Sequence, residues 1–337
     1  MNLNKQTVFI TGSVGFLGEA LLKKFSPDNY TIKAMVYNDE PIPNNFSGID
    51  FVRADITKKE TLNGKLEGVD IVYHLAGVVT DWAPKSLYRD VHVEGTRNLV
   101  EEAIKSGVKK FVFISTLFVI DFTQRGIKNE NSPLVQTRDW YPGTKRVAEE
   151  MLLSYHKKGL IDVAIIRPSW IYGYNDSTFI PEIVYQTRKK MMMIIGNPEN
   201  HIPFVHVDNL AGLIKEAGTA TLKKENIFIA VDGHLTWKDL TDKISNSVHM
   251  NRKIPCLPYF LAYILAYVME TWARVRHVKK RPLLTVSSVS MLGKDIMLDG
   301  SLAKEILHYE PAVEFQSGIS EVISAIVKKP EAELRKK

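Results

Sequence analysis

Short strand-like runs of hydrophobic residues alternate with longer helical patterns over the first half of the chain. The runs are apolar with little internal alternation, which is typical of strands covered on both faces of a sheet. Strands that alternate with helices pair in parallel through right-handed crossovers, so the pattern predicts an α/β fold with a doubly wound parallel sheet. The strand-like runs are 7–10, 30–36, 51–52, 69–75, 110–115 and 163–166, and the helical patterns are 16–25, 85–106 and 139–158.

Beyond Pro168 the pattern becomes irregular, because turn and breaker residues recur between 173 and 203. This half is predicted to form a smaller C-terminal lobe over the carboxyl edge of the sheet, where ligands bind in such folds. Helical patterns return at 207–217, 237–248, 258–275 and 317–328.

Three glycines, Gly12, Gly15 and Gly18, join the first strand to the first helix. In a dinucleotide-binding loop, the first glycine permits a tight turn, the second lets the backbone approach a pyrophosphate, and the third lets the helix pack on the strand. The helix N-terminus adds free N–H groups and a dipole that favours an anion. The predicted cofactor contacts of this loop are Gly12, Val14, Gly15, Phe16 and Leu17.

With this loop, residues 1–168 are expected to form a dinucleotide-binding Rossmann domain, to which later segments (about 205–235) return. Residues 169–337 are expected to form mainly a substrate-binding lobe. An acidic side chain after the second strand favours an unmodified ribose, and an arginine favours a 2′-phosphate. Asp39 stands there, but Tyr37 occupies the place of a discriminating arginine, so NAD and NADP both stay open.

Further cofactor contacts are expected where other strands of the sheet end. Asp55 and Ile56 follow the third strand and are placed near the adenine end of the cofactor, although a solvated loop aspartate is the alternative. The remaining predicted contacts are Leu75, Ala76, Gly77, Lys145 and Pro168.

A tyrosine and a lysine, Tyr141 and Lys145, stand four residues apart in a helical pattern and so share one face of the helix. An ammonium group beside a phenol favours the phenolate, so Lys145 is expected to lower the pKa of Tyr141. Tyr141 would then exchange a proton with a hydroxyl or carbonyl group while hydride moves to or from a nicotinamide. Thr116, at the end of a strand, is expected to orient the reacting oxygen, with Ser115 as the second choice.

Together these motifs resemble the extended short-chain dehydrogenase/reductase family. The segment from Arg167 to Gly173 and the segment from Phe204 to Ala211 are similar to two further motifs of that family. Within the family, residues 258–263, 282–285 and 292–295 look most like the 3β-hydroxysteroid and sterol dehydrogenase branch, with the dihydroflavonol-reductase-like branch as a near neighbour. The resemblance implies a homodimer that pairs through helices of the Rossmann domain.

The leading hypothesis is therefore an NAD(P)-dependent oxidoreductase that interconverts a secondary alcohol and a ketone on a bulky apolar, sterol-like substrate. The alternatives are an NAD(P)H-dependent aldehyde or ketone reductase of the dihydroflavonol-reductase type, a sugar-nucleotide epimerase, and a cofactor-sensing protein without catalysis. Trp170 and the pair Leu117–Phe118 replace polar residues of the sugar-nucleotide enzymes and count against a sugar. His92 stands where the family usually has asparagine, and we interpret it as a plain helix residue rather than a proton relay.

Composition and charge limit the classes of partner that the protein is expected to bind. A net charge of +6 suits nucleic acid or an anionic membrane. The chain shows no helix-turn-helix pattern, zinc-ligand set or aromatic RNA-binding motif, so neither nucleic-acid binding nor a metal site is expected. The one cysteine, Cys256, cannot form an internal disulfide, and no apolar signal core precedes the first strand. A cytoplasmic location is expected.

A late apolar stretch leaves one further possibility. As a helix, residues 257–269 would be about 20 Å long, which is short of the ~30 Å hydrocarbon core of a membrane. An apolar helix followed by clustered cations suits an interfacial anchor, so residues 257–281 are predicted either to contact a membrane or to form a lobe helix or dimer contact. The cations are Arg274, Arg276, His277, Lys279, Lys280 and Arg281.

Overall fold

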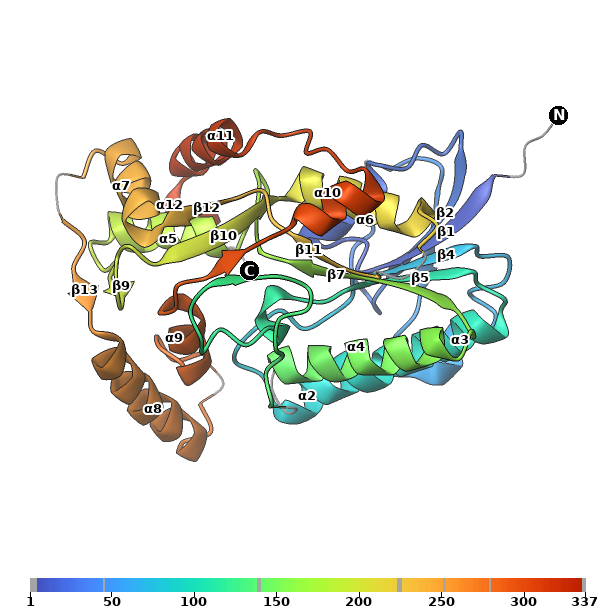
Figure 1. The fold of residues 1–337 in the computed structure, drawn as a ribbon, viewed down its shortest axis with the longest axis horizontal. Coiled ribbons are helices and arrows are strands. Elements are labelled where there is room, and N and C mark those ends of the chain that lie inside the picture. Colours follow the sequence, from blue (N-terminus) through green and yellow to red (C-terminus); the bar gives the residue numbers. More distant parts are fainter. Residues whose placement is uncertain are drawn as a thin grey trace.

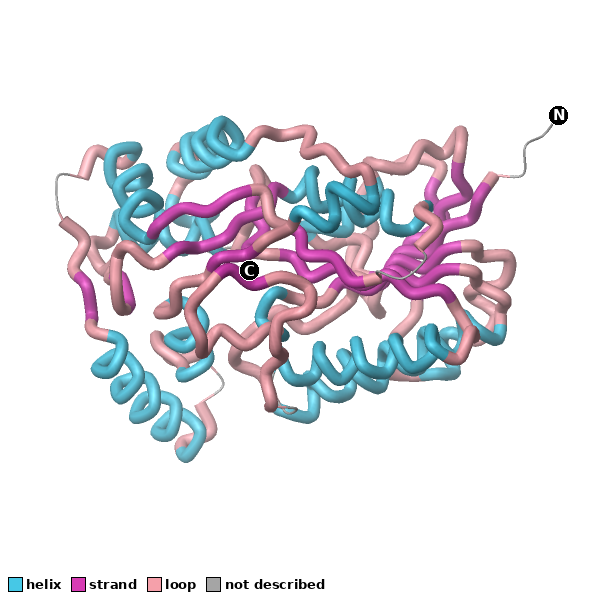
Figure 2. The backbone as a smooth tube through the Cα atoms, viewed as in Figure 1, coloured by secondary structure: helices cyan, strands magenta, loops and turns pink. Residues whose placement is uncertain are grey.

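A computed structural model describes residues 5–44, 46–137, 141–222, 226–250, 253–278 and 280–334. Seven parallel strands form its central sheet, in the order β11-β7-β5-β4-β1-β2-β3, and helices cover both faces (Figures 1 and 2). The doubly wound α/β fold predicted from the sequence is therefore confirmed. The strands are β1 (Gln6–Thr11), β2 (Tyr30–Val36), β3 (Ile49–Arg53), β4 (Ile71–His74), β5 (Lys110–Ile114), β7 (Asp162–Pro168) and β11 (Ile227–Ala230).

Alternate residues of these strands supply the two hydrophobic cores, one on each face of the sheet. Val8 and Ile10 pack with the helices α1 (Phe16–Leu22) and α6 (Val207–Thr219) on one face. Phe9 lies on the other face, with the helices α3 (Thr96–Lys105) and α4 (Tyr141–Lys157). Because both faces are buried, the strands lack the polar alternation of a half-exposed sheet.

The helical pattern predicted at 85–106 is one continuous helical stretch of three parts. It begins as α2 (Lys85–Arg89), continues through a π-helical turn (Asp90–Gly95) and ends as α3. A π-turn of this kind admits one extra residue into a helix and is frequent at functional sites. The helix predicted at 139–158 is α4, whose first described residue is Tyr141; Asp139 lies outside the described residues. Short 3₁₀ turns occupy Lys59–Leu62 and Leu117–Val119.

A second, three-stranded sheet, in the order β12-β10-β8, continues from the carboxyl ends of two central strands (Figure 1). β8 (Trp170–Tyr172) follows β7 directly after Ser169, and β12 (Gly233–Thr236) comes soon after β11. Helices α5, α7 and α11 bury the aromatic core of this sheet. Where the chain divides into domains stays a prediction. The other strands and helices are β10 (His201–His206), α5 (Phe179–Arg188), α7 (Trp237–Ser247), α10 (Ser301–Leu307), α11 (Phe315–Val327) and α12 (Glu331–Leu334).

The helix predicted at 258–275 is α8 (Tyr259–Val275), and it lies at the edge of the molecule, packed on α9 (Val286–Leu292) (Figure 1). Ala262 and Ala266 of α8 are buried in this contact, while most of the large apolar side chains of α8 are exposed. Among the described residues, no helix is long and apolar enough to cross a membrane. Two strand pairs complete the fold, β6 (Ile127–Lys128) with β14 (Met297–Leu298) and β9 (Ile194–Ile195) with β13 (Cys256–Leu257).

Candidate active site

The glycine loop between β1 and α1 leaves no room for side chains at two of its three glycines. Gly12 has φ of +66°, and a Cβ atom there would lie 2.9 Å from the backbone nitrogen of Ala76. A Cβ atom on Gly18 would lie 2.1 Å from the carbonyl oxygen of Gly12. At Gly15 a Cβ atom would meet only the Gly12 carbonyl oxygen, at 3.3 Å, so the outer side of the loop is open. The loop therefore fits a group that approaches the backbone closely, as a pyrophosphate does.

The neighbouring loop residues Val14, Phe16 and Leu17 are half-buried around this opening. Asp39 is exposed in the loop after β2, beside Tyr37. Arg53, at the end of β3, donates hydrogen bonds to the carbonyl oxygens of Asn38 and Glu40. Position 37 lacks an arginine, but a guanidinium group from the next strand reaches the same loop, which the sequence pattern did not reveal.

Asp55 is buried rather than solvated. Its carboxylate accepts hydrogen bonds from the backbone nitrogen of Thr57 at 2.9 Å and from the Thr57 hydroxyl at 2.7 Å. Ile56 is buried against Gly95, where an added Cβ atom would lie 2.8 Å from Ile56 Cδ1. The alternative of a solvated loop aspartate is therefore wrong, and the turn after β3 is held rigidly.

The backbone beyond β4 is fixed by a buried hydrogen-bond network. Thr11 Oγ1 accepts from the backbone nitrogen of Ala76 at 3.1 Å and lies 2.7 Å from His74 Nδ1. His74 Nε2 lies 3.0 Å from Thr96 Oγ1. The Leu75 nitrogen donates to the Thr11 carbonyl oxygen at 3.3 Å. This network sets the path of residues 75–77 next to the glycine loop, while Pro168 is buried at the end of β7.

Tyr141 and Thr116 meet although they are far apart in the sequence. Thr116 follows β5 and its side chain hydrogen-bonds the side chain of Tyr141, the first described residue of α4. Burial raises the pKa of Tyr141, and the hydrogen bond from Thr116 opposes that shift. Ser115 Oγ is buried and has no hydrogen-bond partner among the described residues. The structure thus brings Thr116, rather than Ser115, to the tyrosine.

Lys145 does not act on Tyr141 as the sequence predicted. Its Nζ atom donates a hydrogen bond to the carbonyl oxygen of Ile114 at 2.8 Å and lies 4.7 Å from the centre of the Phe113 ring. Burial lowers the pKa of Lys145 to about 8, and the charge of Glu149 opposes the shift. The expectation that the lysine lowers the phenol pKa is wrong for this arrangement, because the ammonium group faces β5 and burial dominates at Tyr141.

Lys145 instead points towards the end of β4. A Cβ atom added to Gly77 would lie 3.3 Å from Lys145 Nζ and 3.5 Å from His92 Nε2. A side chain at position 77 would therefore crowd the end of the lysine and touch the histidine ring. The side chains of Lys145 and His92 thus both lie beside Gly77, and the His92 ring also packs against Tyr141.

His92 is a further residue whose side chain reaches the site. It is buried in the π-helical turn, and its ring packs edge-on against the ring of Tyr141, with centroids 5.5 Å apart. His92 does lie in a helical turn, as interpreted from the sequence, but its side chain also contacts the predicted catalytic tyrosine. The one signal in the sequence was its place in the motif, where the family usually has asparagine.

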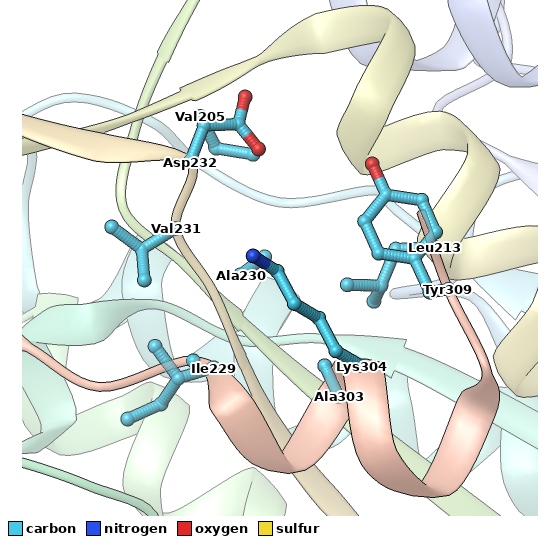
Figure 3. Close-up of a pocket in the computed structure, with 10 residues that line it drawn as sticks. Val205, Leu213, Ile229, Ala230, Val231, Asp232, Ala303, Lys304 and Tyr309 are labelled. Atoms are coloured by element: carbon cyan, nitrogen blue, oxygen red, sulfur yellow. The ribbon is translucent and has the colours of Figure 1, made fainter. Parts of the chain in front are cut away.

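Aromatic side chains border the site next to Thr116. The ring centroids of Phe118 and Trp170 are 5.0 Å apart, and those of Trp170 and Phe179 are 5.6 Å apart. These rings form an aromatic cluster that begins two residues after Thr116. On the opposite face of the sheet, Figure 3 shows a cavity of about 10 Å³ between β11, α6 and α10, which has room for about one water molecule.

Comparison with known proteins agrees with this geometry. Residues 8–230 match the model of the NAD dependent epimerase/dehydratase family. The chain belongs to this family. Like other members of the NAD dependent epimerase/dehydratase family, it is an NAD(P)-dependent enzyme of the extended short-chain dehydrogenase/reductase type, as predicted, and the choice between NAD and NADP stays open.

Two relatives within this family match nearly the whole chain. A 2-alkyl-3-oxoalkanoate reductase of Shewanella oneidensis is 23% identical, over 94% of this chain and 86% of its own. A decarboxylating sterol-4-alpha-carboxylate 3-dehydrogenase of Mus musculus is 26% identical, over 94% of this chain and 90% of its own. In fold, the chain is similar to a UDP-glucose 4-epimerase of Thermotoga maritima, with a TM-score of 0.75 and 19% identity over 96% of this chain and 99% of the other.

Proposed function

We propose that this enzyme interconverts a secondary alcohol and a ketone on a bulky apolar, sterol-like substrate. The observation that carries the proposal is the contact between Tyr141 and Thr116, which comes two residues before the aromatic cluster of Phe118 and Trp170. A proton-transferring phenol bordered by apolar rings suits a hydrophobic alcohol better than a polar sugar. The sterol dehydrogenase among the relatives supports the same substrate class.

The proposed roles follow from the geometry. The bound nicotinamide supplies or accepts the hydride. In the reducing direction, Tyr141 Oη gives its proton to the substrate oxygen, and in the oxidising direction it takes the proton back. Thr116 Oγ1 lies within reach of the same oxygen and orients it. Lys145 is the buried cation of the site, and we propose that it holds the ribose hydroxyls of the cofactor.

We assign the cofactor to the loop at Gly12, Val14, Gly15, Phe16 and Leu17 and to the strand ends at Asp39, Asp55, Ile56, Leu75, Ala76, Gly77 and Pro168. The support is the fit of the glycine loop to a group that approaches the backbone. Residues 1–168, with the later segments (about 205–235) that return to them, would form the cofactor-binding domain, and most of residues 169–337 the substrate lobe.

Reduction of an aldehyde or ketone is the second candidate, and the raised pKa of Tyr141 favours it. A phenol that stays protonated is ready to donate a proton, as reduction requires. The relative from Shewanella oneidensis is also named as a reductase of an oxo group.

The direct test incubates the purified protein with NAD or NADP and a panel of hydroxysteroids and other apolar secondary alcohols, and follows the absorbance of reduced nicotinamide. Turnover of a bulky apolar alcohol supports the proposal and identifies the preferred cofactor. If both cofactors bind but no alcohol reacts, ketones and aldehydes are tried with the reduced cofactors. Activity on a nucleotide sugar alone, without net cofactor turnover, would overturn the proposal in favour of an epimerase.

We further propose that the enzyme acts at the cytosolic face of a membrane, which it contacts through residues 257–281. Large apolar side chains of α8 are exposed, among them Phe260 at 70%, Tyr267 at 60%, Trp272 at 59% and Val275 at 71%. Monomeric proteins seldom expose so contiguous an apolar surface without a partner. An apolar cleft of about 320 Å³ lies between the second half of α8 and Pro282.

Some of the cations between 274 and 281 are paired within the protein and so are not available to bind anionic lipid. Arg274 pairs with Glu270, and Arg281 pairs with Asp81, so both are engaged within the protein. Arg276, His277 and Lys280 follow α8 and are exposed, and Lys279 lies outside the described residues. A homodimer through helices of the Rossmann domain rests on the family resemblance, and light scattering of the purified protein tests it.

A further inference from the structure

His92 makes three contacts that together fix its ring. The Val78 backbone N–H donates to His92 Nε2 at 2.9 Å, and His92 Nδ1 lies 2.9 Å from Thr144 Oγ1. The third contact is with the ring of Tyr141. The histidine thus touches the loop after β4 on one side and the first turn of α4 on the other.

The hydrogen bonds determine where the proton of the imidazole lies. Because Nε2 accepts from Val78, it carries no proton, so the proton of a neutral ring is on Nδ1. Nδ1–H then donates to Thr144 Oγ1, and the Thr144 hydroxyl donates to the carbonyl oxygen of Tyr141 at 3.2 Å. A chain of hydrogen bonds thus runs from the His92 ring through the Thr144 hydroxyl to the backbone carbonyl of Tyr141.

The surroundings keep His92 neutral. Burial lowers its pKa to about 2, and the charges of Lys145 and His74 act in the same direction. The other titratable groups that face the ring are Tyr88 and Tyr141, whose ring centres lie at 5.9 and 5.5 Å. A positively charged imidazole is unfavourable both because it is buried and because it lies next to the ammonium group of Lys145, so a proton relay through imidazolium is disfavoured.

We infer that His92 is a positioning residue, which ties the first turn of α4 to the backbone of Gly77 and Val78. It thereby fixes the positions of Tyr141 and Lys145 relative to the proposed cofactor site. The inference rests on the proposed function. Three observations support it: the two hydrogen bonds of the ring, its contact with the ring of Tyr141, and the position of both His92 and Lys145 beside Gly77.

The chain offers matched variants, because each amide side chain can replace one ring nitrogen. His92→Asn keeps a donor at the place of Nδ1, towards Thr144, and His92→Gln keeps an acceptor at the place of Nε2, towards Val78. His92→Leu keeps neither. We expect kcat to fall by about 100-fold in His92→Leu, as for a misplaced catalytic group, and by about tenfold in each amide variant. Cofactor affinity should be nearly unchanged.

A double-mutant cycle with Thr144→Val separates positioning from general stabilisation. Thr144→Val should add little to His92→Gln, which has already lost the Thr144 contact, but should lower kcat further in His92→Asn. Equal effects in both backgrounds, or a folded His92→Leu protein with undiminished kcat, would overturn the inference.

Nitrogen-15 NMR of the histidine side chains tests the tautomer without any turnover, with His92→Gln used to assign the signal. The expected signal is a neutral ring protonated on Nδ1 that does not titrate between about pH 5 and 8. An imidazolium signal, or a proton on Nε2, would overturn the inference. If the wild-type protein turns over no alcohol or ketone, the proposed function fails, while the NMR signal still decides the state of His92.

Discussion

The Nζ atom of Lys145 donates a hydrogen bond to the carbonyl oxygen of Ile114, 2.8 Å away, at the end of the strand that leads to Thr116. Lys145, which we propose to hold the cofactor, is therefore tied to the strand that leads to Thr116, as well as to its own helix. Burial of this ammonium group has a cost, since a charged group is less stable out of water. The lowered pKa of Lys145 reports that cost.

Protein stability should depend on pH through Lys145. The pKa of this group falls from 10.5 to about 8 on folding. Between these two values the unfolded chain binds more protons than the folded protein, so the contribution of Lys145 to stability rises with pH across this window. We expect the melting temperature of the wild-type protein to rise relative to that of Lys145→Met as the pH increases from about 8 to 10.5. A difference in melting temperature between the two proteins that stays constant across this pH window would show that Lys145 is not buried as a cation.

The glycine loop offers a matched pair of substitutions. Gly18→Ala places a Cβ atom 2.1 Å from the Gly12 carbonyl oxygen, so it should lower the free energy of unfolding by about 1–3 kcal/mol although alanine favours helices. Gly15→Ala meets only one atom, at 3.3 Å, so the protein should fold normally. Its cofactor affinity should fall about tenfold or more, because the added methyl group would hold a pyrophosphate away from the backbone N–H groups, and a hydrogen bond to a charged group contributes about 1.5–3 kcal/mol. Thermal unfolding and cofactor titration measure the two effects. Unchanged cofactor affinity in Gly15→Ala would show that the cofactor does not bind at this loop.

Binding to lipid should depend on the exposed face of α8. Replacing Phe260 and Leu261 by Ser should abolish sedimentation with vesicles that contain phosphatidylserine, because these side chains supply apolar surface and make no part of the core. Leu160→Ser is the control, since Leu160 is exposed to a similar degree, outside α8. If the wild-type protein stays in the supernatant, or if the α8 variant still sediments, the membrane proposal is wrong.

The sequence predicts those parts of the site that depend on local patterns. The spacing of the glycines places Gly12 and Gly18 at positions where no side chain fits, and the four-residue spacing places Tyr141 and Lys145 on one helix. Parallel strands end at one edge of the sheet, which explains why Thr116 is brought to the tyrosine.

Features that depend on packing between distant segments were not predictable in the same way. His92 and Thr144 are 52 positions apart, and their contact depends on how the π-helical turn packs on α4. The orientation of Lys145 towards Ile114 is set by burial, which a helical spacing does not express. The second sheet was missed because β8 is a strand of three residues and Pro203 lies within β10.

The central claim is that Tyr141 carries the proton in an alcohol–ketone reaction. The direct test compares kcat of the wild-type protein and Tyr141→Phe on one bulky apolar alcohol, with cofactor affinity measured on both proteins. The phenylalanine variant should lose at least about 100-fold in kcat, the contribution expected of a general acid or base, while its cofactor affinity stays nearly the same. A folded variant that keeps most of the wild-type kcat would contradict the account.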